Sequence, residues 1–180
     1  AATKAARRFS RAQASRGLNP RAGIHQPGLR TPRPGRSDGG VGTWGPGKNY
    51  GSPRSQAYEE QVTGVPIEHS YIVNGVEFDG YNGFALVDAK GPGYDPLIKG
   101  HWSREPESTY RTDPVTGELK RVKKGLIDKA KDQVKAVRAT GTDTPIQWHI
   151  ADKYTFDTLR DKQDWGKFPA EIELIHTPPN

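Results

Sequence analysis

The sequence contains neither cysteine nor methionine among its 180 residues. Without cysteine, the chain has no disulfide framework and no thiolate metal site. It also lacks an apolar run long enough to span a membrane, and it lacks a secretory signal with an apolar centre. The absence of methionine predicts a module counted within a longer polypeptide, such as a C-terminal module; simple removal of an initiator methionine is the alternative.

Apolar residues are also scarce, at 32% of the chain, and the scarcity reflects mainly the first part. Residues 1–56 carry eleven basic residues and one acid, Asp38, whereas residues 57–180 carry 16 basic and 20 acidic residues. Five prolines from Pro27 to Pro53 exclude a long helix there and leave room only for a short one over residues 3–15. We therefore expect a basic Pro/Gly-rich linker or docking tail, followed by a globular domain.

The globular part has the pattern of a mixed α/β (α+β) domain. Apolar residues recur every three or four positions from Val122 to Val137, which predicts a helix that ends at Gly141. Residues 94–119 are expected to be irregular, with a turn or hairpin at 113–117. The expected helices are 56–62, 121–139 and 153–165, and the expected strands are 71–73, 76–81, 84–90, 145–150 and 170–176. Together they predict a central sheet of about four or five strands flanked by helices.

The dipeptide Asn82-Gly83 lies between two strand-like runs and predicts a β-hairpin. A two-residue loop there would pair Tyr81 with Phe84, and Glu77 with Asp88. Side chains alternate between the faces of a strand, and paired residues share a face. The residues expected on one face are Glu77, Asp79, Leu86, Asp88 and Lys90. The hairpin therefore gathers several carboxylates and one ammonium group.

Carboxylates that lie close together raise each other's pKa, and a divalent cation relieves the repulsion. Mg²⁺ is commonly held by one or two carboxylates and by further oxygen atoms. Asp79 and Asp88 are the candidate ligands, and the backbone carbonyl of Ala89 is a candidate neutral ligand. Lys90 would then position the attacking water or stabilise charge that develops on a phosphate. The alternative is a solvated strand face that merely carries charges.

An acid from the preceding helical turn, Glu60 or else Glu59, is expected to support the metal through water. Gln133 shares the buried stripe of the 121–139 helix, where a polar side chain requires a partner. It is either a satisfied boundary residue or a group that orients water or phosphate. The same helix is strongly basic, which predicts phosphate contacts or simply a solvated face. The candidate DNA-binding residues are Lys123, Lys124, Lys131, Lys135 and Arg138.

Two stretches, residues 76–81 and 86–94, resemble the restriction-endonuclease-fold nucleases of bacterial polymorphic toxins, which belong to the PD-(D/E)xK superfamily. The strongest part is Phe78-Asp79-Gly80 followed by Asp88-Ala89-Lys90-Gly91, and Phe78 stands where the superfamily has proline. The Gln133 helix and the closing strands match as well, so the resemblance covers about residues 58–178. It implies a restriction-endonuclease-like core.

The resemblance also implies a function. It predicts a metal-dependent phosphodiesterase, a DNase that uses Mg²⁺ or Mn²⁺. Such a nuclease would be a toxin module secreted by a bacterium, often by a contact-dependent or type VI machine, and delivered into the cytoplasm of a competitor. A cognate immunity protein would block it in the producing cell. The basic tail, residues 1–56, would then dock onto a carrier or delivery protein.

Two other functions are compatible with the sequence. A metal-independent ribonuclease would use a histidine as acid or base, for which His101, His149 and His176 are available. A non-catalytic module would use the tail and the basic helix to bind nucleic acid, and it would leave the nucleic acid uncut. Sensitivity of cleavage to EDTA separates these alternatives.

Overall fold

The structure is a computed structural model and describes residues 25–47, 51–99 and 107–180. The expected helix over residues 3–15 lies outside these ranges. No helix within them combines the length and apolar character that crossing a bilayer requires. The elements are β1 (Thr43–Pro46), α2 (Pro53–Thr63), β2 (His69–Val73), β3 (Val76–Phe78), β4 (Gly80–Tyr81), β5 (Leu86–Lys90), α3 (Tyr94–Lys99), β6 (Thr109–Thr112), β7 (Leu119–Lys123), α4 (Leu126–Arg138), β8 (Ile146–Ile150), α5 (Lys153–Asp164) and β9 (Ile172–His176).

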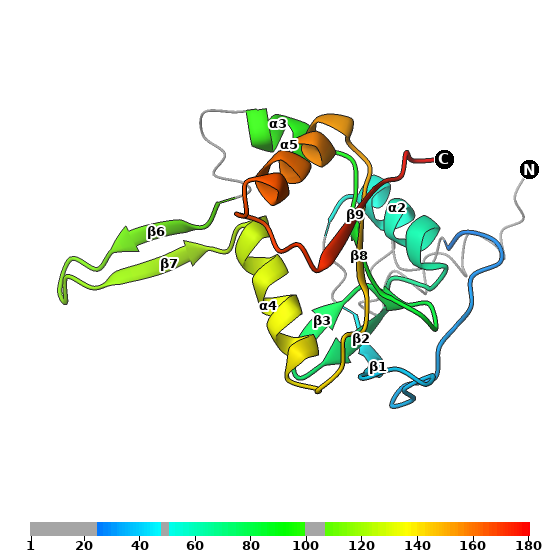
Figure 1. Cartoon of the computed structure of the whole chain (residues 1–180). Helices are drawn as coiled ribbons and strands as arrows, with labels where there is room; N and C mark the ends of the chain where they lie inside the picture. The colour runs from blue at the N-terminus through cyan, green and yellow to red at the C-terminus, as the bar shows by residue number, and fades with distance from the viewer. Residues whose placement is uncertain (1–24, 48–50, 100–106) are drawn as a thin grey trace, which may run out of the picture.

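The central sheet has four strands in the order β4-β5-β8-β9. Strands β5, β8 and β9 are parallel, and the short β4 adds to β5 in the antiparallel direction. Helices α4 and α5 lie on one side of this sheet and α2 lies on the other (Figure 1). The expectation of a mixed sheet flanked by helices is confirmed. The predicted alternation in β8 is also confirmed, because Ile146, Trp148 and Ile150 are buried.

Helix α4 begins five residues later than the sequence predicts. Residues 119–123 form β7, which pairs with β6 in a separate two-stranded ribbon. Val122, which fits the helical spacing, is 59% exposed on this ribbon. The helix therefore starts after Gly125, and its buried stripe runs from Leu126 to Val137. The expected turn at 113–117 is present: Asp113 Oδ1 accepts hydrogen bonds from the amides of Val115 and Thr116, at 2.8 and 3.1 Å.

A second, three-stranded antiparallel sheet has the order β1-β2-β3. Its first strand comes from the segment that the sequence assigns to the tail. Trp44 in β1 is 1% exposed, packs edge-on against Tyr71, and donates a 2.8 Å hydrogen bond from Nε1 to Asp38 Oδ2. Within the expected irregular tail, the strand at residues 43–46 and the buried Trp44 thus attach residues 25–47 to the domain. This segment, which we call the strap, is part of the folded domain.

One apolar core joins the two sheets. Its members include Trp44, Tyr71 and Phe78 of the small sheet, and it continues through Leu126 of α4 to Trp148 of β8. Burial of apolar surface against several elements is the main favourable contribution to folding. Because the strap supplies Trp44 to this core, it contributes to the stability of the whole domain.

Replacing Trp44 by alanine tests this contribution. We expect Trp44→Ala to lower the free energy of unfolding by about 3–5 kcal/mol, because it leaves a cavity in the core. Trp165 is 69% exposed, so Trp165→Ala should change stability by about 0.5 kcal/mol or less. Urea denaturation followed by circular dichroism measures both variants. Equal, small effects would show that the strap does not belong to the fold.

Candidate active site

The chain bends at Asp79, and the bend divides the predicted strand over residues 76–81. Strand β3 pairs with β2 and places Glu77 opposite Ile72, not opposite Asp88 as predicted. Strand β4 pairs with β5. The long hairpin expected from the sequence is therefore shared between two sheets that diverge at this residue.

The loop between β4 and β5 is longer than predicted. Tyr81 lies opposite Leu86, so the expected pairing of Tyr81 with Phe84 is wrong. The side chain of Asn82 closes the loop, because its Oδ1 accepts hydrogen bonds from the amides of Phe84 and Ala85, at 3.0 and 2.8 Å. An Asn side chain commonly replaces a backbone acceptor in a turn in this way.

This register error spans two residues and therefore leaves each side chain on its predicted face. If the observed pairing of β4 with β5 is extended by one residue, Asp79 lies opposite Asp88. Strand β4 does not include Asp79, because it begins at Gly80. Instead, Asp79 Oδ2 accepts a 2.7 Å hydrogen bond from the amide of Ala89. The N–H and C=O of one strand residue point to the same side, so the Ala89 carbonyl also faces the open edge of β5.

A cleft of about 650 Å³ lies at this open edge. Helix α2 borders it on one side, where Gly91 permits a close approach: a Cβ at Gly91 would lie 3.2 Å from Ser55 Cα. The charged residues that line the cleft are Glu59, Glu77, Asp79, Asp88, Lys90, Lys124, Lys129 and Asp132. Acidic side chains thus outnumber basic ones around the cleft.

Lys90 and Asp88 form a buried ion pair in the cleft, with 8% and 5% exposure. The ammonium also lies 4.4 Å from the centre of the Trp148 ring. Burial alone would lower the pKa of Lys90, but the negative charge of Asp88, followed by Tyr94 and Asp79, outweighs this effect and raises it. Lys90 is therefore held as a cation against the indole ring.

Two other acids of the cleft, Asp79 and Glu59, are poorly compensated. Burial raises the pKa of Asp79 well above its usual range, and the charges of Asp88 and Glu59 add to the shift. Burial, and then Asp88, raise the pKa of Glu59 to about 8. Within the described part of the chain, no three His, Cys, Asp or Glu side chains form a ready metal site. The excess of carboxylates is nevertheless the feature that favours a bound cation.

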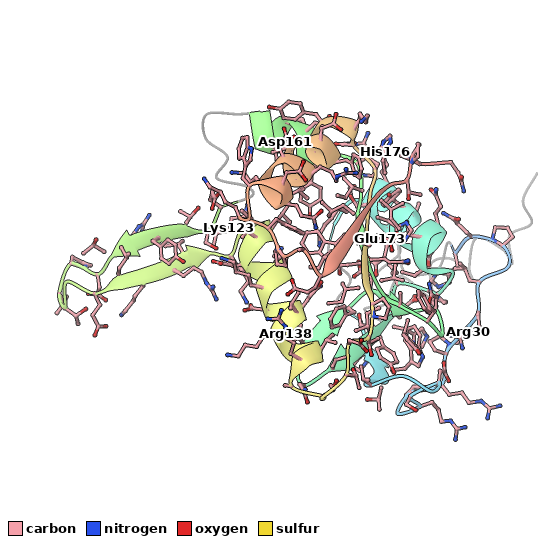
Figure 2. The ribbon with its side chains drawn as sticks, in the orientation of Figure 1. Arg30, Lys123, Arg138, Asp161, Glu173 and His176 are labelled. Atoms are coloured by element: carbon pink, nitrogen blue, oxygen red, sulfur yellow. The ribbon has the colours of Figure 1, made fainter. Side chains whose placement is uncertain are left out.

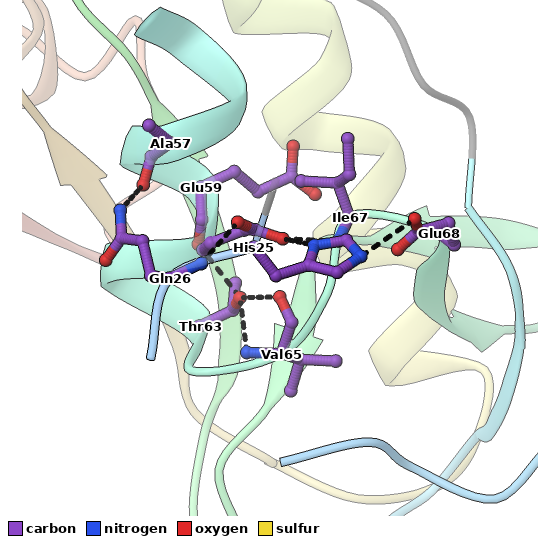
Figure 3. A network of polar contacts seen from close by, with 9 residues as sticks. His25, Gln26, Ala57, Glu59, Thr63, Val65, Ile67 and Glu68 are labelled. Atoms are coloured by element: carbon purple, nitrogen blue, oxygen red, sulfur yellow. Dashed lines mark hydrogen bonds and ion pairs between the residues drawn. The ribbon is translucent and has the colours of Figure 1, made fainter. Parts of the chain in front are cut away.

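Glu60, the upstream acid preferred from the sequence, does not line the cleft. It belongs to the network of polar contacts around His25 and Glu68 that Figure 3 shows. It is 3% exposed and contacts His25 Nδ1 at 2.5 Å, and it accepts a 3.3 Å hydrogen bond from the amide of Ile67. Contact with Glu60 raises the pKa of His25. Glu60 therefore contacts the strap, whereas its neighbour Glu59 lines the cleft.

Gln133 lies where the sequence places it, buried at 5% exposure and lining the cleft. Its Oε1 accepts a 2.7 Å hydrogen bond from Trp148 Nε1. Among the described residues, its amide NH₂ has no hydrogen-bond acceptor. Trp148 therefore contacts both Lys90 and Gln133, and the sequence identified it only as a core residue.

The predicted DNA-binding residues separate into two groups. Lys124 lines the cleft and pairs with Asp132, and Lys123 lies beside it at the base of the β6–β7 ribbon (Figure 2). Lys131, Lys135 and Arg138 line another groove, of about 460 Å³, where Arg138 pairs with Glu171. Lys129, which also lines the cleft, was not among the predicted contacts.

Two of the histidines proposed for a ribonuclease, His149 and His176, do not line the cleft. His149 contacts Thr177 Oγ1 at 2.8 Å, and burial lowers its pKa. His176 contacts the carbonyl of Ala151 at 3.2 Å and packs near Phe156. His101 lies outside the described residues. The geometry therefore offers no support for histidine-based chemistry in this cleft.

A mixed sheet whose strand β5 presents Asp88 and Lys90 beside an acidic cleft is consistent with a nuclease of the restriction-endonuclease class. A family model described as restriction endonuclease fold toxin 5 matches residues 55–153, more than half of the chain. The chain therefore belongs to this family of toxins, which points to a nuclease. Comparison with curated proteins and with solved structures gives no match.

The raised pKa of Glu59 predicts a pH dependence of stability. The folded state binds this proton more tightly than the unfolded state, so its stabilising contribution is lost as pH rises from about 4.5 to about 8. Without divalent cation, we expect the free energy of unfolding to decline over this range. In Glu59→Gln the decline should be smaller by on the order of 2–4 kcal/mol.

Urea denaturation in EDTA at pH 5 and at pH 8.5 measures this difference. Glu118→Gln, at an exposed position on the β6–β7 turn, is the control for removal of a carboxylate charge. The same pH slope in all three proteins would contradict the pKa assigned to Glu59.

Proposed function

We propose that this chain is a metal-dependent endonuclease that hydrolyses phosphodiester bonds in DNA. The observation that carries the proposal is the gathering of Asp79, Asp88 and Lys90 at the open edge of β5, in a cleft with excess negative charge. Membership of a restriction endonuclease fold toxin family supports the same reaction class.

The residues of the cleft fit a hard divalent cation. Asp79, Asp88 and the carbonyl of Ala89 would hold it, with Glu59 in the supporting role first expected of Glu60. Mg²⁺ or Mn²⁺ bound there would supply Lewis-acid chemistry at a phosphate oxygen. The elevated pKa values of Asp79 and Glu59 support this assignment, because both carboxylates lack sufficient positive charge nearby.

The chain's own groups would act on the water and on the phosphate. Lys90, fixed by Asp88 and by the Trp148 ring, carries a charge that would stabilise the phosphorane as negative charge develops. Gln133 would donate its amide NH₂ to the attacking water or to a phosphate oxygen. Trp148 holds the opposite end of that amide, which makes it a positioning residue. Lys123, Lys124 and Lys129 would bind the flanking phosphates.

The biological setting of the proposal follows from the family. We infer a C-terminal antibacterial module of a larger secreted effector that acts in the cytoplasm of the target cell. A cognate immunity protein would neutralise it in the producer. Residues 57–180, together with the strap, would form the nuclease domain, and the segment before the strap would dock onto a carrier or delivery protein.

Removal of one charged group tests the catalytic assignment. Asp79→Asn, Asp88→Asn and Lys90→Met should each lower plasmid cleavage by about a hundredfold or more while circular dichroism stays unchanged. Asp161→Asn, at an exposed position on α5, is the matched control and should cleave as the parent does. Cleavage should require Mg²⁺ or Mn²⁺ and stop in EDTA. Undiminished nicking by Asp88→Asn, or EDTA-resistant cleavage of RNA alone, would refute the proposal.

The neighbouring glutamates provide a second test. Glu59→Gln should lower cleavage at saturating Mg²⁺ at least about tenfold without lowering the melting temperature, because Glu59 lines the cleft. Glu60→Gln should instead destabilise the fold by about 1–3 kcal/mol, because it weakens the contact with His25. Activity per folded molecule should persist in that variant. The opposite result would restore Glu60 as the upstream acid.

A further inference from the structure

The β6–β7 ribbon is the one feature of the described chain that projects away from the body of the domain (Figure 1). It has two short strands joined at residues 113–118, and about five residues of strand give a reach of roughly 15 Å. All five residues of β7 are exposed. A lone two-stranded ribbon is only marginally stable in water, so this exposed one requires an explanation.

The base of the ribbon is fastened to the helix that borders the cleft. Ser108 Oγ contacts Asp128 on the first turn of α4 and accepts a 2.9 Å hydrogen bond from the amide of Gly125. Arg121 Nη1 lies 3.5 Å from the same Asp128 carboxylate. These contacts fix the direction of the ribbon relative to the cleft, so the two surfaces can engage one ligand.

Positive charge runs from the ribbon into the cleft. Arg111, Lys120, Arg121 and Lys123 are exposed on the ribbon. Lys124 follows directly and lines the cleft together with Lys129. Acidic residues of the ribbon lie near its turn, where Asp113 is engaged by two backbone amides and by Lys120. The charge therefore complements a polyanion that crosses the base of the ribbon and enters the cleft.

Exposed apolar side chains accompany these charges. Tyr110 is 45% exposed, Val122 is 59% exposed and Leu119 is 68% exposed. The major groove of B-form DNA admits a two-stranded ribbon, with apolar contacts to base methyl groups on its floor and phosphates along its walls. A-form RNA has a deep and narrow major groove that excludes side chains.

We propose that the β6–β7 ribbon is a clamp that enters the major groove of B-form duplex DNA and aligns one strand with the cleft. This inference rests on the proposed nuclease function and specifies its substrate as double-stranded DNA. Arg111 and Lys123 bind phosphates on either wall of the groove. A protein partner is the competing occupant of the ribbon, and the charge that continues into the cleft favours the duplex.

The test measures binding in the Asp88→Asn full-length chain with a fluorescent 30-base-pair DNA duplex, its single strand, and the matching RNA duplex. Arg111→Gln with Lys123→Gln should weaken duplex DNA binding about tenfold and lower the slope of log affinity against log salt by about one to two. Binding of the single strand and of duplex RNA should change less than twofold. Lys153→Gln with Arg160→Gln on α5 removes the same charge elsewhere and should have no effect.

The outcomes distinguish the two proposals. A ribbon variant that retains the parent's duplex affinity, while the wild-type chain cuts DNA, overturns the clamp and assigns the ribbon to a protein partner. Equal losses for single-stranded and duplex DNA also overturn it, because the ribbon would then bind phosphates without entering a groove. A wild-type chain that neither binds nor cuts nucleic acid refutes the proposed function itself, and the clamp with it. These surface substitutions remove no buried group, and thermal denaturation verifies that each variant folds.

Discussion

The whole site depends on one hydrogen bond, in which the Asp79 carboxylate accepts the amide of Ala89. At this point a side chain replaces a strand, because β4 has ended and β3 has turned away to the other sheet. The amide N–H of Ala89 keeps a hydrogen-bond acceptor while the edge of β5 opens. The divergence of the two sheets thereby creates a cleft in which acidic side chains outnumber basic ones.

This arrangement has an electrostatic cost. Carboxylates confined away from water bind protons more tightly, as the raised pKa values of Asp79 and Glu59 indicate. The single buried ammonium of Lys90 compensates only part of the charge. A domain designed for stability alone would place apolar residues here. The retention of several acids at one sheet edge is therefore a sign of function, and it agrees with the family to which the chain belongs.

The spacing of apolar residues within single segments predicts much of the fold. Strands β8 and β9 and helix α5 follow from apolar spacing that lies within each segment, and the faces of Asp79, Asp88 and Lys90 survived a register error because side chains alternate with a period of two. The rest of the fold depends on pairing between strands that lie apart in the sequence. Val122 fits a helical stripe, but β6 pairs with residues 119–123 and makes them a strand. Likewise Trp44, among glycines and prolines, becomes a core residue only through its neighbours in β2.

The choice between two adjacent glutamates shows the same limit for the site. Residues 59 and 60 point about 100° apart on a helix, and helical geometry alone does not reveal which one faces the cleft. The deciding partner of Glu60 is His25, 35 residues away. Lys129 was overlooked for a similar reason, since the orientation of α4 depends on which strands it covers.

Trp148 belongs at once to the core and to the cleft. Its ring packs against Phe168, its Nε1 holds Gln133, and its face supports Lys90. The indole ring of Trp148 therefore makes the positions of Gln133 and Lys90 depend on the packing of the core. A substitution that changes the packing around Trp148 would also displace Gln133 and Lys90 in the cleft. The interior of this toxin should therefore tolerate far less evolutionary change than its surface.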